Sequence, residues 1–325
     1  MELTDTFGRT INYLRLSVTD RCNMRCVYCM PADGIPLLTH NDILSYEELL
    51  LVAKTAVASG IEKIRVTGGE PLVRKGIVPF LTRLAAIPGL RQLVLTTNGL
   101  YLAEMAESLR QAGVQRLNIS LDSLQPETFA GITRGADLHR VMAGIAAAEQ
   151  AGFPLKINVV VMRSVNDGEI LDFAAMTLDR PLTVRFIEYM PAIRADNWED
   201  LIVPGETILD RIGNRFRFSP MERDASAGPA RTFRIDGAAG TIGVITPVSG
   251  HFCDECNRIR VTASGRARSC LFSDIGYDLK PFLAAGDESG LAVALHDIVA
   301  RKPGRHSLES AEQQHTPFAM SAIGG

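Results

Sequence analysis

Residues 12–31 read NYLRLSVTDRCNMRCVYCMP, a short apolar strand that runs directly into three cysteines. The strand pattern recurs through the first 190 residues, and helical patterns separate its copies. Strand candidates lie at 12–18, 61–67, 91–97, 114–121, 155–162 and 182–190, and helix candidates lie at 46–59, 75–86, 101–112, 126–151 and 167–179. Strands that alternate with helices form parallel βαβ units. Six units are too few for a closed eight-stranded barrel, so we predict an α/β fold with a partial, open barrel. A doubly wound sheet is the alternative.

The pattern changes after Met190, where loop-rich stretches separate short strand candidates. The segments RTFRI, TIGVIT and RIRVT, at 231–235, 241–246 and 258–262, are expected to be strands that pair antiparallel. We therefore predict two domains, residues 1–190 and residues 191–325. The second is a smaller α+β region with an irregular tail from Arg301.

Composition limits the class of protein. The chain has 325 residues and a net charge of −3, which argues against a surface that coats nucleic acids. Its start, MELTDTFGRT, lacks the basic residues and apolar core of a signal peptide. No apolar run approaches the ~18 residues of a membrane span. We expect a soluble cytoplasmic protein that binds neither nucleic acid nor membrane.

The six cysteines fall into two sets of three: Cys22, Cys26 and Cys29, then Cys253, Cys256 and Cys270. Without a secretory signal, clustered cysteines are metal ligands more often than disulfides. Three thiolates on a [4Fe–4S] cluster leave one iron open to a small molecule. Zinc is the alternative, with His40 as a distant fourth ligand for the first set and His251 for the second, as H-x-C-x2-C-x13-C.

Unusual residues follow the predicted strands. The first cysteines follow the first strand, and TGGEP, TTNG, SLDS and EYMP follow or end later ones. Active sites of α/β barrels and open sheets form at the carboxyl ends of the strands. We expect these segments to meet on one face.

Cations interrupt strands that should be apolar. Parallel strands buried on both faces read as continuous apolar runs. Arg15, Arg65, Lys156 and Arg185 each lie between apolar neighbours, and Arg258 and Arg260 share one face of a later strand. We expect these side chains to point into the barrel, where a buried charge needs a partner. Internal salt bridges would supply one; a polyphosphate would satisfy several cations at once. No GxxxxGK[ST] is present, so a nucleotide would not be held by a P-loop.

The motif C-x3-C-x2-C, with Tyr28 before its third cysteine and TGGEP some 40 residues later, resembles the signature of the radical S-adenosylmethionine (SAM) superfamily. The resemblance implies a partial (βα)6 TIM-like barrel. It also implies a [4Fe–4S] cluster on Cys22, Cys26 and Cys29 whose open iron chelates SAM. One-electron reduction then yields a 5′-deoxyadenosyl radical.

Within the superfamily, CDECNRIRVT followed by Cys270, and the terminal Gly324-Gly325, are similar to the GTP 3′,8-cyclase family. The resemblance implies a second [4Fe–4S] cluster that binds guanine, held by Cys253, Cys256 and Cys270. It implies SAM contacts at Tyr28, Gly69, Ser120 and Met190, and GTP contacts at Arg15, Arg65, Thr96, Lys156, Arg258 and Arg260. It gives Arg258, Arg260, Gly324 and Gly325 roles in catalysis. Arg185 has no match, and by itself the Gly-Gly end would be a frayed terminus.

The implied reaction is the first step of molybdenum-cofactor biosynthesis. The radical removes hydrogen from C3′ of GTP, and C3′ attacks C8 to give (8S)-3′,8-cyclo-7,8-dihydroguanosine 5′-triphosphate. The implied partners are GTP, SAM, a flavodoxin-like electron donor and a downstream cyclic pyranopterin monophosphate synthase, for a monomer or homodimer. Two alternatives are another radical SAM enzyme with an auxiliary cluster that relays electrons, and a zinc-binding module that is not an enzyme.

Overall fold

The computed structural model describes residues 2–190, 198–222, 228–250, 252–273, 276–306 and 320–324. Among these residues, no helix combines the length and the apolar character needed to cross a membrane. Six parallel strands lie side by side in chain order: β1 (Tyr13–Ser17), β2 (Lys63–Thr67), β3 (Gln92–Thr97), β4 (Arg116–Ser120), β5 (Leu155–Val161) and β6 (Thr183–Glu188). All six predicted strands are confirmed.

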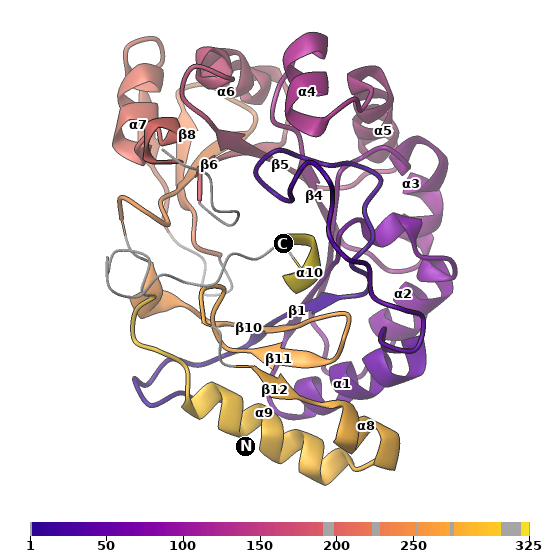
Figure 1. The fold of residues 1–325 in the computed structure, drawn as a ribbon. Coiled ribbons are helices and arrows are strands. Elements are labelled where there is room, and N and C mark those ends of the chain that lie inside the picture. The colour runs from indigo at the N-terminus through magenta and orange to yellow at the C-terminus, as the bar shows by residue number, and fades with distance from the viewer. Residues whose placement is uncertain are drawn as a thin grey trace.

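The outer face of this sheet is covered by helices α1 (Tyr46–Ala58), α2 (Ile77–Ala85), α3 (Leu102–Gln111), α4 (Pro126–Thr133), α5 (Leu138–Gln150) and α6 (Ile170–Asp179). Figure 1 shows them as an arc around the strands, which is the predicted partial barrel. Short 3-10 turns η1 (Pro71–Val73) and η2 (Asp167–Glu169) follow β2 and β5.

The predicted helix 126–151 is wrong in one respect, because it is two helices. Arg134 and Gly135 both have positive φ, of 56° and 103°, and they end α4. The side chain of Asp137 then accepts a hydrogen bond from His139 N and caps α5. A cap in the middle of an apolar pattern starts a new helix.

The C-terminal region extends both edges of the same sheet. It contains α7 (Gly205–Gly213), β7 (Phe218–Pro220), β8 (Arg231–Ile235), β9 (Thr241–Ile245), β10 (Arg258–Val261), β11 (Arg266–Arg268), β12 (Tyr277–Asp278), α8 (Lys280–Ala285), α9 (Glu288–Ala300) and α10 (Met320–Ile323), with 3-10 turns η3 (Trp198–Leu201) and η4 (Cys253–Glu255). The twelve described strands have the order β12-β11-β10-β1-β2-β3-β4-β5-β6-β9-β8-β7.

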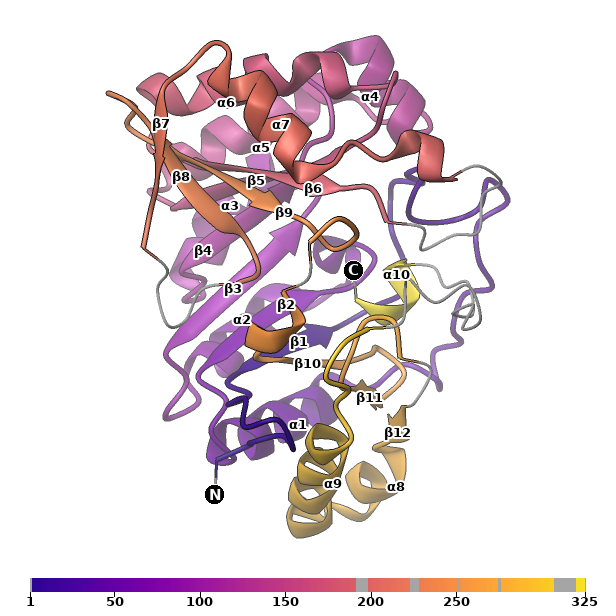
Figure 2. The ribbon, with the colours of Figure 1, turned by 90° about the vertical axis from the view of Figure 1, so that its left-hand side faces the viewer.

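The expected antiparallel pairing is found between β8 and β9, whereas β10 pairs antiparallel with β11, a strand that was not predicted. The prediction was incomplete, because β9 also pairs parallel with β6, and β10 also pairs parallel with β1. Figure 2 shows β9 along β6 with β8 beyond it, and β10 along β1 with β11 beyond it. The second region therefore does not form a sheet of its own, and a domain boundary at residue 190 stays a prediction.

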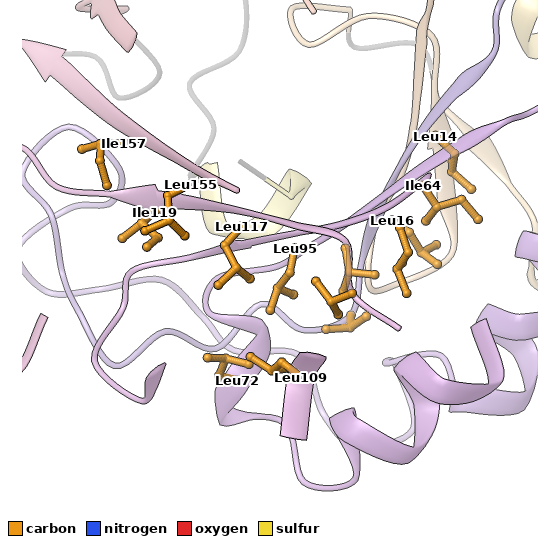
Figure 3. Packing of buried hydrophobic residues seen from close by; sticks show 14 of the residues in the cluster. Leu14, Leu16, Ile64, Leu72, Leu95, Leu109, Leu117, Ile119, Leu155 and Ile157 are labelled. Atoms are coloured by element: carbon orange, nitrogen blue, oxygen red, sulfur yellow. The ribbon is translucent and has the colours of Figure 1, made fainter. Parts of the chain in front are cut away.

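Each strand of the barrel separates an apolar outer face from a polar inner face. Leu14, Leu16, Ile64, Leu95, Leu117 and Ile157 are fully buried and lie toward the helices (Figure 3). Successive side chains of a strand point to opposite faces. The residues between these leucines and isoleucines, such as Arg15 and Arg65, therefore face the interior. Strand register sets Arg15 beside both Arg65 and Arg260.

Candidate active site

One cavity of about 290 Å³ occupies the open side of the barrel and collects most of the predicted site. Its walls include all six cysteines, Tyr28, Gly69, Ser120, Met190, Arg15, Arg65, Thr96, Arg185, Arg258 and Arg260. The cysteine loop and residues of TGGEP, TTNG, SLDS and EYMP all line it. The predicted convergence of the strand ends is confirmed. Of the predicted GTP contacts, only Lys156 is outside the lining.

The first cysteine set lies in the loop after β1. Two hydrogen bonds stabilise the loop. Cys29 N donates to Cys26 O at 2.9 Å, and Arg134 Nη1 donates to Met30 O at 3.0 Å. Burial raises the pKa of Cys22 to about 11 and that of Cys29 to about 12. Buried thiols at this pKa become thiolates when a metal cation is bound to them. Three reduced cysteines facing one cavity fit an iron–sulfur cluster with one open iron.

The second cysteine set lies across the same cavity, on η4 and at the ends of β10 and β11. Burial alone would raise the pKa of Cys256, but Arg258 and Lys302 outweigh it and lower that pKa to about 6. Arg258 Nη2 lies 3.6 Å from Cys256 Sγ and donates to it. This electropositive setting fits a thiolate-bound cluster. His251, the fourth ligand of the zinc alternative, is outside the described residues.

Carboxylates hold the SAM end of the predicted site in place. Tyr28 Oη donates to Asp122 Oδ2 at 2.7 Å, and Val160 N donates to Asp122 Oδ1 at 2.8 Å. Glu70 is buried at the end of β2 and accepts hydrogen bonds from Leu72 N, Thr97 Oγ1 and Asn98 N. Burial raises the pKa of Asp122 to about 6 and that of Glu70 to about 7. The sequence analysis gave Asp122 and Asn98 no role.

Gly69 is required by a close approach of backbone. A Cβ atom there would lie 2.3 Å from Arg21 O, which belongs to the segment that leads into the first cysteine. Gly69 N also donates to Thr19 O at 2.8 Å. Any side chain at position 69 would therefore push TGGEP away from the cysteine loop.

Cations gather on the inner face of the sheet. Arg65, Arg185 and Arg260 form no ion pair with a carboxylate of the described chain. Arg185 Nη2 instead donates to Asn118 Oδ1 at 2.5 Å. Internal salt bridges, the alternative to an anionic ligand, do not explain these three arginines. Buried polar atoms that find no hydrogen-bond partner among the described residues include Thr96 Oγ1, Asn158 Oδ1 and Arg185 Nε. Such atoms are typical of a site that a polar ligand completes.

Two lysines belong to the same cluster. Burial and the nearby arginines lower the pKa of Lys156 to about 7. Burial also lowers the pKa of Lys63 to about 8, against the opposing effect of Tyr13. Lys63 was missed in the sequence, although it lies two residues before Arg65 and therefore on the same face of β2.

The described end of the chain lies inside the barrel (Figure 1). Met320 N donates to Cys29 O at 3.1 Å, and Arg260 Nη1 donates to Gly324 O at 3.4 Å. Gly324 has a φ of +75°, and a Cβ there would lie 2.7 Å from Thr67 Oγ1. Only glycine fits this conformation at this distance. Gly325 is outside the described residues.

Comparison with known proteins gives the family. The sequence profile of the Radical SAM superfamily matches residues 16–177, and that of Molybdenum Cofactor Synthesis C matches residues 182–308. A GTP 3′,8-cyclase of Geobacter sulfurreducens is 66% identical over 100% of both chains. The chain belongs to the GTP 3′,8-cyclase family. A second relative, the GTP 3′,8-cyclase of Moorella thermoacetica, is 49% identical over 99% of this chain and 100% of its own.

Solved structures agree with the fold of this cyclase-family chain. Streptococcus suis SuiB bound to S-adenosylmethionine superposes with a TM-score of 0.60 over 89% of this chain and 69% of its own, at 12% identity. At this identity the likeness shows the fold alone. The expected cofactors of the GTP 3′,8-cyclase family, SAM and two [4Fe–4S] clusters, are confirmed at the level of the family.

Proposed function

We propose that this protein cyclises GTP to (8S)-3′,8-cyclo-7,8-dihydroguanosine 5′-triphosphate, the first step in making the molybdenum cofactor. The single observation that carries this proposal is a cavity lined by both cysteine triads and by arginines, of which Arg65, Arg185 and Arg260 form no ion pair with a carboxylate of the described chain. Full-length similarity to GTP 3′,8-cyclases supports it.

The residues divide into a SAM side and a GTP side. Residues 1–190 would supply Cys22, Cys26 and Cys29 for the first cluster, with SAM contacts at Tyr28, Gly69, Ser120 and Met190. When bound and reduced, that cluster and SAM supply a 5′-deoxyadenosyl radical able to remove a hydrogen atom. Asp122 would orient the Tyr28 ring through its hydrogen bond, and Glu70 would hold the TGGEP turn.

Residues 191–325 would supply the second cluster ligands, Cys253, Cys256 and Cys270, and the tail. The triphosphate would lie on Arg15, Arg65, Lys156, Arg258 and Arg260, with Thr96 beside it. Arginine pairs with phosphate oxygens by two parallel hydrogen bonds, which fixes orientation as well as charge. Fixed cations in a dry cavity would hold the ribose and guanine in a reactive geometry and exclude water.

Four further expectations stay predictions: the flavodoxin-like electron donor, the downstream cyclic pyranopterin monophosphate synthase, the monomeric or homodimeric state, and the cytoplasmic location. Each concerns a partner or a compartment outside this chain.

GTP binding is expected to take up protons at pH 8. Lys156, with a pKa of about 7, is then mainly neutral, and Lys63, with a pKa of about 8, is half neutral. A triphosphate favours the charged lysine and raises both pKa values, so on the order of one proton enters per GTP. The affinity therefore weakens as pH rises above about 7.

Calorimetry measures this uptake in two buffers of different ionisation enthalpy. Lys156→Met should reduce the buffer dependence of the binding enthalpy, whereas Lys54→Met, at an exposed position on α1, should not. Equal binding enthalpies in both buffers for the unaltered protein would contradict the assignment of the lysines.

Anaerobic reconstitution tests the proposed function. The protein is loaded with iron and sulfide, both are counted per chain, and 5′-deoxyadenosine is followed after adding SAM, dithionite and GTP. We expect about eight irons and 5′-deoxyadenosine formed only with GTP. About four irons with one zinc would refute the GTP site and leave another radical SAM reaction.

A further inference from the structure

Lys302 lies in the segment after α9, and only 3% of its surface is exposed. Its Nζ donates to Arg258 O at 2.9 Å and to Ser269 O at 2.5 Å. Arg258 comes two residues after Cys256, and Ser269 directly precedes Cys270. One side chain therefore joins the two segments that carry the second and third cysteines of the C-terminal set.

The charge of Lys302 has no carboxylate partner in the described chain. Backbone carbonyls accept two of its three N–H donors but leave its net charge in place. Burial lowers the pKa of Lys302, and the thiolates of Cys256 and Cys270 oppose that effect and favour the charged form. A buried ammonium needs an anion close by, so the geometry of this site makes the cysteine sulfurs its partner.

The segment that carries Lys302 is fixed from a third direction. Arg9, which pairs with Asp5 at 2.5 Å, donates from Nη1 to Cys253 O at 2.6 Å and from Nη2 to Pro303 O at 2.8 Å. The first cysteine of the set and the residue next to Lys302 are thus held by the same guanidinium. The position of Lys302 relative to all three cysteines is set by hydrogen bonds.

We propose that Lys302 is a positioning residue for the second iron–sulfur site, which it serves by its fixed positive charge. Three thiolates on a [4Fe–4S]²⁺ core give a net charge of −1, and one-electron reduction makes it −2. Lys302 offsets this charge beside Cys256 and Cys270, which favours cluster assembly and raises the reduction potential, because net charge and hydrogen bonds near the sulfurs set that potential. The inference rests on the proposed function, since it needs a cluster at the second cysteine set.

The test uses the full chain with Cys22, Cys26 and Cys29 all replaced by serine, so that iron is bound only at the second set. In this background we compare Lys302 with Lys302→Arg, which keeps the charge, and Lys302→Met, which removes it at similar length. Lys54→Met on the surface of α1 is the matched control. Iron and sulfide per chain are counted after anaerobic reconstitution, and the midpoint potential is measured by titration with dithionite.

The parent, Lys54→Met and Lys302→Arg are expected to bind about four irons at similar potentials. Lys302→Met is expected either to lose most of this iron or to keep it at a more negative midpoint potential. Four irons at an unchanged potential in Lys302→Met would overturn the inference, as would equal iron loss in Lys302→Arg and Lys302→Met. No iron in the parent itself would instead overturn the second cluster, and the proposed function with it.

Discussion

Arg260→Ala is expected to lower the rate of GTP cyclisation by on the order of 100- to 1,000-fold while about eight irons per chain still assemble. Arg260 is 6% exposed, and burial and Arg258 lower its pKa to about 10. It remains charged at neutral pH without a carboxylate partner in the described chain. Its removal therefore takes a pre-positioned cation from the site that we assign to the triphosphate.

The rate is measured as 5′-deoxyadenosine and cyclised product formed in the presence of GTP, with iron counted on the same sample. Arg91→Ala is the matched control, because Arg91 is exposed and pairs with Glu62 at 3.0 Å. Arg258→Ala should also lose activity, but Arg258 donates to Cys256 Sγ, so this variant changes a cluster ligand as well. Unimpaired turnover in Arg260→Ala would refute its assignment to GTP.

Removal of Gly324 and Gly325 is expected to stop turnover while GTP and SAM still bind. The carbonyl of Gly324 accepts a hydrogen bond from Arg260, and α10 is held by Met320 N at Cys29 O. The tail thus touches both sides of the cavity. Without these two glycines, GTP and SAM keep their own contacts. Arg260 and the cysteine loop, however, are no longer linked by the chain end that contacts both of them.

Gly324→Ala tests the same tail without shortening it. A Cβ at Gly324 would lie 2.7 Å from Thr67 Oγ1 and 2.9 Å from Ser17 Cβ, at a positive φ that side chains rarely adopt. We expect a loss of turnover of at least ~10-fold. Ala322→Ser, at an exposed position of α10, should be neutral. Full turnover in the truncated protein would mean that the Gly-Gly end is only a frayed terminus.

The strands and the position of the site were predictable because both follow from short-range rules. Apolar runs locate buried strands, and residues at their carboxyl ends meet on one face. A charged residue such as Arg65 lies between two neighbours that are buried against the helices. Because successive side chains of a strand point to opposite faces, its own side chain points to the inner face. The hydrophobic periodicity alone does not identify a cofactor. The cysteine spacing and the TGGEP segment predicted SAM and the iron–sulfur cluster.

What the sequence did not show depends on contacts between distant residues. The hydrogen bonds from Arg134 Nη1 to Arg25 O and Met30 O, which tie the end of α4 to the cysteine loop, join segments more than 100 residues apart, and no local pattern contains them. The parallel pairing of β10 with β1 joins segments more than 200 residues apart. Lys302 lay in a tail without a recognisable motif, and only its two carbonyl partners reveal its place.

The pairing of β9 and β10 onto opposite edges of the barrel has a consequence for biogenesis. Until the last third of the chain leaves the ribosome, β1 and β6 are open edges with unsatisfied backbone groups, and such edges promote aggregation. The nascent barrel therefore needs its own C-terminal part, or a chaperone, to protect it. The second cysteine set, Cys253, Cys256 and Cys270, becomes complete only in that late step, so iron delivery to this set must follow the synthesis of Cys270.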